Sequence, residues 1–432
     1  MKRFGGILLG VLLAVVGLVS AGFGLFNALG DGEAETRFLA GATAIPFGIM
    51  LLELGLAAAW LTMRGTRDDD RGAMLPPWWA SALVFAVAVA SGWAALYFDQ
   101  WWAFFPLTTV AVFVPLAAAG RLGLPRIGWR PGWSRLLAAF AWGAIATPIL
   151  AIAGQLAAIV GVAVAAVVGL MMGGQENFQL VTDTWRYYLQ GRSLNADQEA
   201  ALLQYVLREP LVLVAGASIL VFAAPATEEL FKFAAVPLFA RTRSRPNGPV
   251  ADPPLTIFLL GLASGLGFAA TENVLYVGSA SEAGWLAMVL TRGVTPMMHG
   301  TATALFALGY ARQAQRPRGW SLLWGALAAL GLHGTWNLCA GLLLVAGAFS
   351  TGANAPTGLA VLLLVLSLAV LGGLLLLCIA TLLRQRRALA IVPATESLPP
   401  GGPGTPALPP VPSPFAPAPP PPFGGPLRAG SE

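Results

Sequence analysis

The sequence has 432 residues, of which 57% are apolar and only 10% are charged, and its mean hydropathy is +0.72. A soluble protein of this length could not bury so much apolar surface, so repeated apolar stretches of about 20 residues indicate helices that cross a bilayer. The net charge of +5 does not indicate nucleic-acid binding, because the arginines lie in short loops between these stretches. The two cysteines, Cys339 and Cys378, lack metal-ligand spacing and are predicted to pack as small hydrophobic residues.

The apolar stretches predict an all-α, polytopic transmembrane helical bundle with about ten spans. The predicted spans are residues 5–29, 38–63, 78–98, 101–120, 136–172, 211–240, 255–278, 285–310, 320–349 and 360–383. The first stretch is too long for the apolar region of a signal peptide, and further spans follow it, so it is interpreted as a transmembrane helix. The stretch 136–172 is too long for one simple span; it is either one crossing with a partly embedded helix or two crossings.

The arginines favour one crossing within residues 136–172. With a single net crossing there, all the basic loops fall on the same side of the membrane, and a second crossing would separate them. By the positive-inside rule, the sequence then predicts a multi-pass protein of the plasma membrane with both termini in the cytoplasm.

Four regions follow from this organisation: N-terminal transmembrane helices (1–135), a long apolar segment with an extracytoplasmic amphipathic connector (136–210), a polar-residue core (211–390) and a tail (391–432). The polar part of the connector, residues 173–210, is interpreted as a plain link, with a lid or a substrate dock as alternatives. The tail is proline-rich and of low complexity, which predicts disorder.

Three charged residues interrupt the apolar run at residues 211–240. Glu228, Glu229 and Lys232 each cost roughly 2.5–3.5 kcal/mol to insert at the centre of a membrane helix, so they are rarely there without a use. On a helix that starts near Pro225, Lys232 is four residues from Glu228 and three from Glu229. The lysine can therefore pair with either carboxylate.

Three later spans carry further polar clusters. The first holds Phe268, Glu272 and Asn273, the second Arg292 and His299, and the third His333 and Asn337. His333 and Asn337 are four residues apart and share a helix face. Glu53, alone in the second span, either joins this site or is a packing residue.

Two kinds of hydrolytic chemistry fit these residue types. Two histidines and a carboxylate can bind Zn²⁺ and leave a position for water. Without a metal, a glutamate can take a proton from water while a histidine and an asparagine stabilise the oxyanion. The alternatives are an ion-coupled membrane transporter, a non-catalytic membrane binding protein, or polar residues that only hold helices together.

The motifs Glu228-Glu229-x-x-Lys232, Phe268-x-x-x-Glu272-Asn273, His299 and His333-x-x-x-Asn337 resemble those of the PrsW family of intramembrane proteases. That family is distantly similar to the CAAX-prenyl proteases and bacteriocin-immunity membrane proteins, from which this chain departs by Glu272 in place of a histidine and by the position of Lys232. The resemblance implies an endopeptidase that cleaves membrane-anchored proteins, with an anti-sigma-factor-like protein as one substrate class.

The resemblance also implies roles for individual residues. Glu228 and Glu229 would activate water, with His333 and Asn337 as ligands or oxyanion partners. Glu272 and His299 would be further ligands or orienting groups, so that a tentative Zn²⁺ set is His299, His333 and Glu272; a metal-free glutamate mechanism is the alternative. Lys232 and Arg292 would balance charge, and the partners would be a membrane-anchored protein substrate and the lipid bilayer.

Overall fold

The computed structural model describes residues 2–30, 34–64, 75–124, 133–173, 210–245, 248–281, 284–351 and 357–390. Within these ranges the chain is helical apart from one short β-hairpin, and eight helices are long and apolar enough to cross a membrane. This confirms the predicted all-α transmembrane bundle. The predicted connector, except for its end residues, and the predicted tail lie outside the described ranges.

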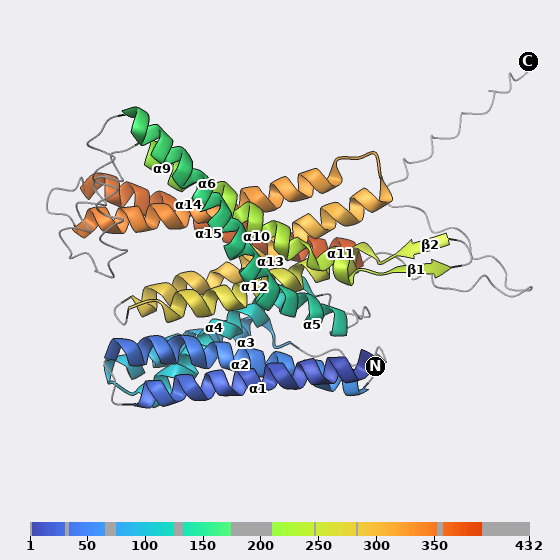
Figure 1. Ribbon diagram of the computed structural model, residues 1–432, viewed down its shortest axis with the longest axis horizontal. Helices are drawn as coiled ribbons and strands as arrows, with labels where there is room; N and C mark the ends of the chain where they lie inside the picture. Colours follow the sequence, from blue (N-terminus) through green and yellow to red (C-terminus); the bar gives the residue numbers. More distant parts are fainter. Residues whose placement is uncertain are drawn as a thin grey trace, which may run out of the picture. The chain divides into compact units, whose positions relative to one another are not determined.

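The elements follow one another in the order shown in Figure 1. The N-terminal helices are α1 (Lys2–Leu29), α2 (Ala34–Arg64), α3 (Trp78–Tyr97) and α4 (Trp101–Gly123). A long helical run consists of α5 (Trp133–Ala141), the π-helix η1 (Trp142–Ala146) and α6 (Thr147–Gly173). A second interrupted run consists of α9 (Pro210–Ser218), the π-helix η2 (Ile219–Ala223), α10 (Ala224–Phe233) and α11 (Ala235–Phe239). After β1 (Thr242–Arg245) and β2 (Gly248–Ala251) come α12 (Pro254–Gly278), α13 (Trp285–Gln315), α14 (Ser321–Thr351) and α15 (Thr357–Ala390).

The stretch predicted at residues 136–172 is one uninterrupted helical run rather than two helices joined by a turn. Its apolar part, Trp133–Gly161, is a single candidate span. The two predicted spans that are not among these eight candidates are the α9–α11 run, which is divided into short helices, and α13. These two carry Glu228, Glu229, Lys232, Arg292 and His299, which belong to the polar cluster described below.

Helices α1 and α2 pack with their backbones in close contact. A Cβ atom added to Gly17 would lie 2.5 Å from the Gly48 carbonyl oxygen, and one added to Gly48 would lie 2.6 Å from the Gly17 oxygen. Gly10 and Gly55 meet in the same way one level away along the helices. Small residues permit such approach between helices in lipid, where packing has to replace the hydrophobic effect.

Each π-helix precedes a proline and packs against a neighbouring helix. Pro148 and Pro225 have no N–H group, so the carbonyls of Ala144 and Val221, four residues earlier, lose their usual α-helical donor. The Thr271 hydroxyl on α12 donates to the Ala144 carbonyl at 2.5 Å. At the second site, Gly334 on α14 lies directly against the Val221 carbonyl. The two interruptions are thus docking points for α12 and α14.

Helix α12 is the most deeply buried of the candidate spans. It contacts α13, the α5–η1 run and the N-terminal helices α2 and α4. In Figure 1 the α5–α6 run crosses the bundle obliquely, and α12 lies beneath this crossing. This arrangement surrounds the polar face of α12 with α6, α10 and α13.

The antiparallel hairpin pairs Thr242 with Ala251 and Arg245 with Gly248. Its base is held to the start of α5, because the Arg135 guanidinium contacts the Asp252 carboxylate at 2.5 Å. The same carboxylate accepts a hydrogen bond from the Arg241 backbone N–H at 2.7 Å. The end of α11 and the start of α12 are thereby fixed relative to α5.

Candidate active site

Helix α10 places three ionisable side chains inside the protein. Glu229 and Lys232 are fully buried and Glu228 is 6% exposed. The Lys232 ammonium donates to Glu229 Oε1 at 2.8 Å and to Glu228 Oε2 at 3.3 Å, which confirms the pairing expected from their spacing. It also lies 2.9 Å from His299 Nδ1 and 4.0 Å from the centroid of the Phe268 ring. Lys232 therefore joins α10 to both α12 and α13.

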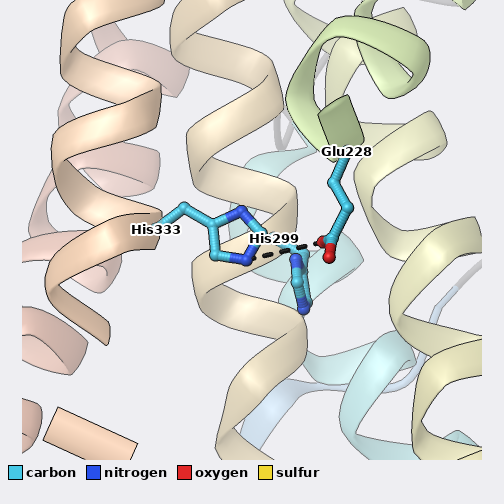
Figure 2. Close-up of side chains that lie close together, drawn as sticks. All are labelled: Glu228, His299 and His333. Carbon is cyan, nitrogen blue, oxygen red and sulfur yellow. Dashed lines mark ion pairs between the residues drawn. The ribbon is translucent and has the colours of Figure 1, made fainter. Parts of the chain in front are cut away.

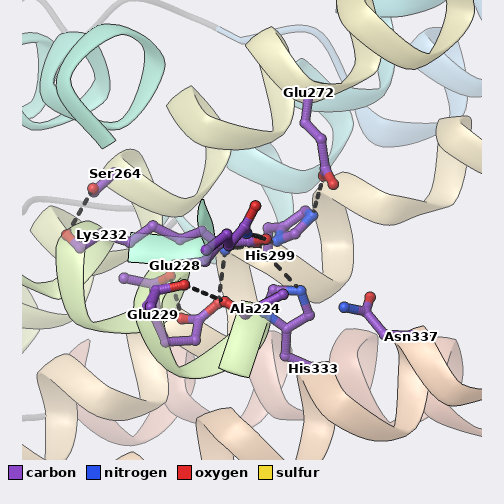
Figure 3. Close-up of polar contacts among 12 residues, drawn as sticks. Ala224, Glu228, Glu229, Lys232, Ser264, Glu272, His299, His333 and Asn337 are labelled. Atoms are coloured by element: carbon purple, nitrogen blue, oxygen red, sulfur yellow. Dashed lines mark hydrogen bonds and ion pairs between the residues drawn. The ribbon is translucent and has the colours of Figure 1, made fainter. Parts of the chain in front are cut away.

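The Glu229 carboxylate is fully engaged by neighbouring helices. Its Oε1 atom also lies 2.9 Å from His333 Nδ1 on α14, and its Oε2 atom accepts a hydrogen bond from the Thr303 hydroxyl on α13 at 2.8 Å. Figure 3 shows Glu229 together with Lys232 and His333. A buried carboxylate with three polar partners is well suited to hold its neighbours in place.

Glu228 is the carboxylate of the pair that faces open space. It lines a pocket of about 390 Å³ between α6 and α12. Its Oε1 atom accepts a hydrogen bond from the Gln155 side-chain amide on α6 at 3.0 Å, and its Oε2 atom lies 3.5 Å from His333 Nε2. Of the two adjacent glutamates, Glu228 is therefore the one that a substrate or a water molecule can reach.

His299 is held on both sides. Its Nε2 atom lies 2.6 Å from Glu272 Oε2, while its Nδ1 atom faces Lys232. Glu272 also forms an ion pair with Arg292. The Arg292 Nε–H donates to the Asn273 side-chain oxygen at 3.2 Å. Each histidine thus has a carboxylate that fixes its ring: Glu272 for His299 and Glu229 for His333.

Three side chains from three helices could hold a metal ion together. One potential ligand atom from each of Glu228, His299 and His333 lies within 4.8 Å of the others, and all three residues are buried (Figure 2). Two histidines and one carboxylate are a ligand set known from catalytic zinc sites. The donor types and their spacing fit a divalent cation, and the two orienting carboxylates, Glu229 and Glu272, resemble the partners that metal-bound histidines usually have.

This grouping differs from the metal set predicted from the sequence, which had Glu272 in place of Glu228. Glu272 contacts Arg292 and the far nitrogen of His299 instead. Lys232 also contacts both His299 and Glu228, so its ammonium and a metal ion would compete for the same electron pairs.

Two residues predicted as possible site members lie apart from the cluster. The Asn337 amide donates to the Leu220 carbonyl of η2 at 3.2 Å, although Asn337 lies on the same helix face as His333 (Figure 3). Glu53 lines a separate, mainly apolar pocket of about 420 Å³ among α2, α4, α5 and α12.

Two residues of the cluster were not identified from the sequence. Gln155 and Thr303 bind Glu228 and Glu229, respectively. Gln155 stands alone as an amide side chain in the apolar run from Pro148 to Met172, and this isolation was the available signal. Thr303 gave no such signal, because the hydroxyl of a threonine in a membrane helix can hydrogen-bond to a carbonyl of its own helix.

A membrane bundle with a buried cluster of glutamates and histidines beside a pocket is the arrangement expected of an intramembrane hydrolase. Residues 131–372, more than half of the chain, match the PrsW family intramembrane metalloproteases. The protein therefore belongs to the PrsW family, a family of membrane-embedded peptidases, and is a multi-pass membrane protein with a protein substrate. No curated protein and no solved structure matches the sequence.

Proposed function

We propose that the cluster around Glu228, His299 and His333 hydrolyses a peptide bond of a membrane-anchored protein. The observation that carries this proposal is the convergence of these three side chains inside the bundle, where Glu228 also lines a pocket. A regulatory protein of the anti-sigma-factor type is the substrate class that the resemblance to the family implies. The arginine-rich loops support a location in the plasma membrane with both termini in the cytoplasm.

Within this proposal, Glu228 and Glu229 have different tasks. Glu228 lines the pocket and takes a proton from the attacking water, which then adds to the scissile carbonyl. The proton passes to the leaving amine as the carbon–nitrogen bond breaks. Glu229 has no access to the pocket and instead holds His333 and Lys232 in place.

As an imidazolium, His333 is the best-placed donor for the developing oxyanion. Its Nδ1–H donates to Glu229, so its Nε2–H points to the side of Glu228. A positioned donor of this kind contributes about 10²–10³-fold to the rate in acyl-transfer enzymes.

A divalent cation, when bound, would supply a Lewis acid at the same place. Glu228, His299 and His333 are the residues that would hold it. The chain's own contribution is then the orientation of the two histidine rings by Glu229 and Glu272.

The test is cleavage of a co-expressed membrane-anchored protein by variants of the cluster. Glu228→Gln, Glu229→Gln and His333→Ala are expected to abolish cleavage while the protein remains inserted in the membrane. Glu53→Gln is the matched control, because it removes a carboxylate from a transmembrane helix outside the cluster and should leave cleavage intact. Full cleavage by all three cluster variants would refute the assignment.

Metal analysis of the purified protein separates the two chemistries. About one zinc ion per chain, lost in His333→Ala and kept in Glu53→Gln, would support the metal-dependent form. Cleavage by protein that contains no metal and resists chelators would support activation of water by Glu228 alone.

A further inference from the structure

The pocket lined by Glu228 lies between two helices that separate from each other. Helix α6 contributes Ile152 and Gln155 to its wall, and α12 contributes Leu275 and Tyr276. Glu228 and Glu272 are the carboxylates that line it. A pocket with mainly apolar walls and a reactive carboxylate is what a peptide bond must meet when an apolar segment approaches from the bilayer.

The separation of α6 from α12 has a local cause. Along α5 and the π-helix the run touches α12 at the backbone, since a Cβ on Gly143 would lie 1.9 Å from the Ser264 oxygen and one on Gly267 would lie 2.0 Å from the Phe140 oxygen. The bond from Thr271 to the Ala144 carbonyl adds a third close contact, also within the π-helix. Beyond Pro148, α6 contacts mainly α10, and the pocket lies between α6 and α12.

The volume of the pocket limits what can enter. The pocket has a volume of about 390 Å³, whereas an α-helix with its side chains is about 10 Å across and its backbone groups are already hydrogen-bonded to one another. A locally extended stretch of chain is narrower and leaves its peptide groups free. It therefore suits the space beside Glu228 better than an intact transmembrane helix does.

An extended stretch in an apolar setting needs partners for its backbone groups. The wall offers two. Among the described residues, neither the Gln155 side-chain oxygen nor the Tyr276 hydroxyl has a hydrogen-bond partner. The Gln155 oxygen can accept a hydrogen bond from a substrate N–H, and the Tyr276 hydroxyl can donate one to a substrate carbonyl.

We infer that the cleft between α6 and α12 is the substrate channel, and that it binds an extended segment from the membrane-spanning part of the substrate. Gln155 is a positioning residue in this channel, because it holds Glu228 and presents its oxygen to the substrate backbone. This inference rests on the proposed function and adds the route and the conformation of the substrate.

Tryptophan substitutions on one helix test the route. Ile152 lines the cleft, whereas Ile149, one turn earlier, is an exposed residue of α6 that does not line it. The probe is a quenched-fluorescent peptide with a single transmembrane segment, reconstituted with the full-length enzyme in liposomes. Ile152→Trp should slow its cleavage by about tenfold or more, as expected when a reacting group is displaced by a few ångströms. Ile149→Trp should leave the rate within about twofold.

Crosslinking provides a readout that does not depend on turnover. A photoreactive phenylalanine at position 152 in a Glu229→Gln background should capture the uncleaved peptide, and the same group at position 149 should not. If the wild type cleaves the peptide but position 152 neither captures it nor slows cleavage when replaced by tryptophan, the channel is refuted while the protease assignment stands. If the wild type cleaves no membrane peptide, the proposed function itself fails.

The Gln155 side chain has its own test. Gln155→Leu keeps the size of the side chain but removes both hydrogen bonds, so it should raise KM as well as lower kcat. Gln155→Glu keeps the acceptor and places a carboxylate beside Glu228. It should therefore bind the peptide better than Gln155→Leu does while turning it over more slowly than the wild type does. A kcat and KM equal to those of the wild type in Gln155→Leu would remove Gln155 from the channel.

Discussion

Lys232 is the residue on which the charges of the site depend. Its ammonium is fully buried and touches Glu228, Glu229 and His299. Removing one partner of a buried ion pair leaves the other charge without compensation, which typically destabilises a protein by about 3–5 kcal/mol. The loss of this one lysine would leave both glutamates without their ammonium partner.

We expect Lys232→Met to lower the thermal unfolding temperature of the detergent-solubilised protein strongly and to abolish cleavage. The double variant Lys232→Met/Glu229→Gln removes one charge of each sign, so it should recover most of the lost stability without recovering activity. The unfolding temperatures of the single and the double variant can be measured from intrinsic tryptophan fluorescence during heating. A double variant no more stable than the single one would show that packing, rather than charge, is the role of Lys232.

The helix pairs in this bundle are spaced by glycines whose positions are specific. Gly143 and Gly267 lie where α5–η1 meets α12, and no Cβ atom fits at either position. A methyl group there has to push two backbones apart, which would also break the hydrogen bond between Thr271 and Ala144. Overpacking of this kind typically costs about 1–3 kcal/mol.

We predict that Gly143→Ala and Gly267→Ala each destabilise the protein and reduce cleavage, because the shift reaches α6 and the cleft beside Glu228. Gly161→Ala is the control on the same helical run, since nothing lies within 4 Å of the position that its Cβ would take. It should be neutral or slightly stabilising, as alanine favours a helix more than glycine does. Equal unfolding temperatures for all three variants would contradict the close contact.

The contacts among these helices show which parts of the site could be predicted from the sequence. The spacing of Glu228, Glu229 and Lys232 predicted their pairing, because an α-helix fixes which residues share a face. The cluster around His299 and His333 was likewise expected. The contact from Gln155 to Glu228 was not expected. A π-helix changes the direction in which all later side chains of the run point, and Gln155 follows such a π-helix.

Asn337 is a residue whose position was predicted but whose contact was not. Helical spacing correctly placed it on the face that carries His333, but not the partner that it would meet there. That partner is the Leu220 carbonyl, in the π-helix just before Pro225. A backbone group made available by an irregular turn has no signature in a hydrophobicity pattern.

At the scale of the whole molecule, four N-terminal helices precede the part of the chain that matches the family model. Residues 131–372 match the family, and helices α1–α4 precede them. The α1–α2 pair is held by its glycine contacts, and α4 packs against α12 and α13. The N-terminal helices therefore pack against the matched part, and none of their described side chains belongs to the cluster.

The topology is open to a direct measurement. With ten crossings, reporter fusions before Lys2 and after Ala390 should report the same, cytoplasmic side. A reporter inserted between Gly173 and Pro210 should report the opposite side, because α5–α6 is one continuous run. An insertion in the 65–74 loop, which should be cytoplasmic, is the control. Opposite sides for the two ends would require an odd number of crossings.

The charged face of α10 has a consequence for how the protein is made. Its partners His299, Thr303 and His333 lie on α13 and α14, at least 67 residues further along the chain. When α10 leaves the ribosome these helices have not been synthesised, and Lys232 can balance only one of the two carboxylate charges of α10. The bilayer disfavours the remaining charge, so the arrival of α13 and α14 should stabilise the inserted α10. The same polar contacts thus couple the stability of an early helix to helices that are made later.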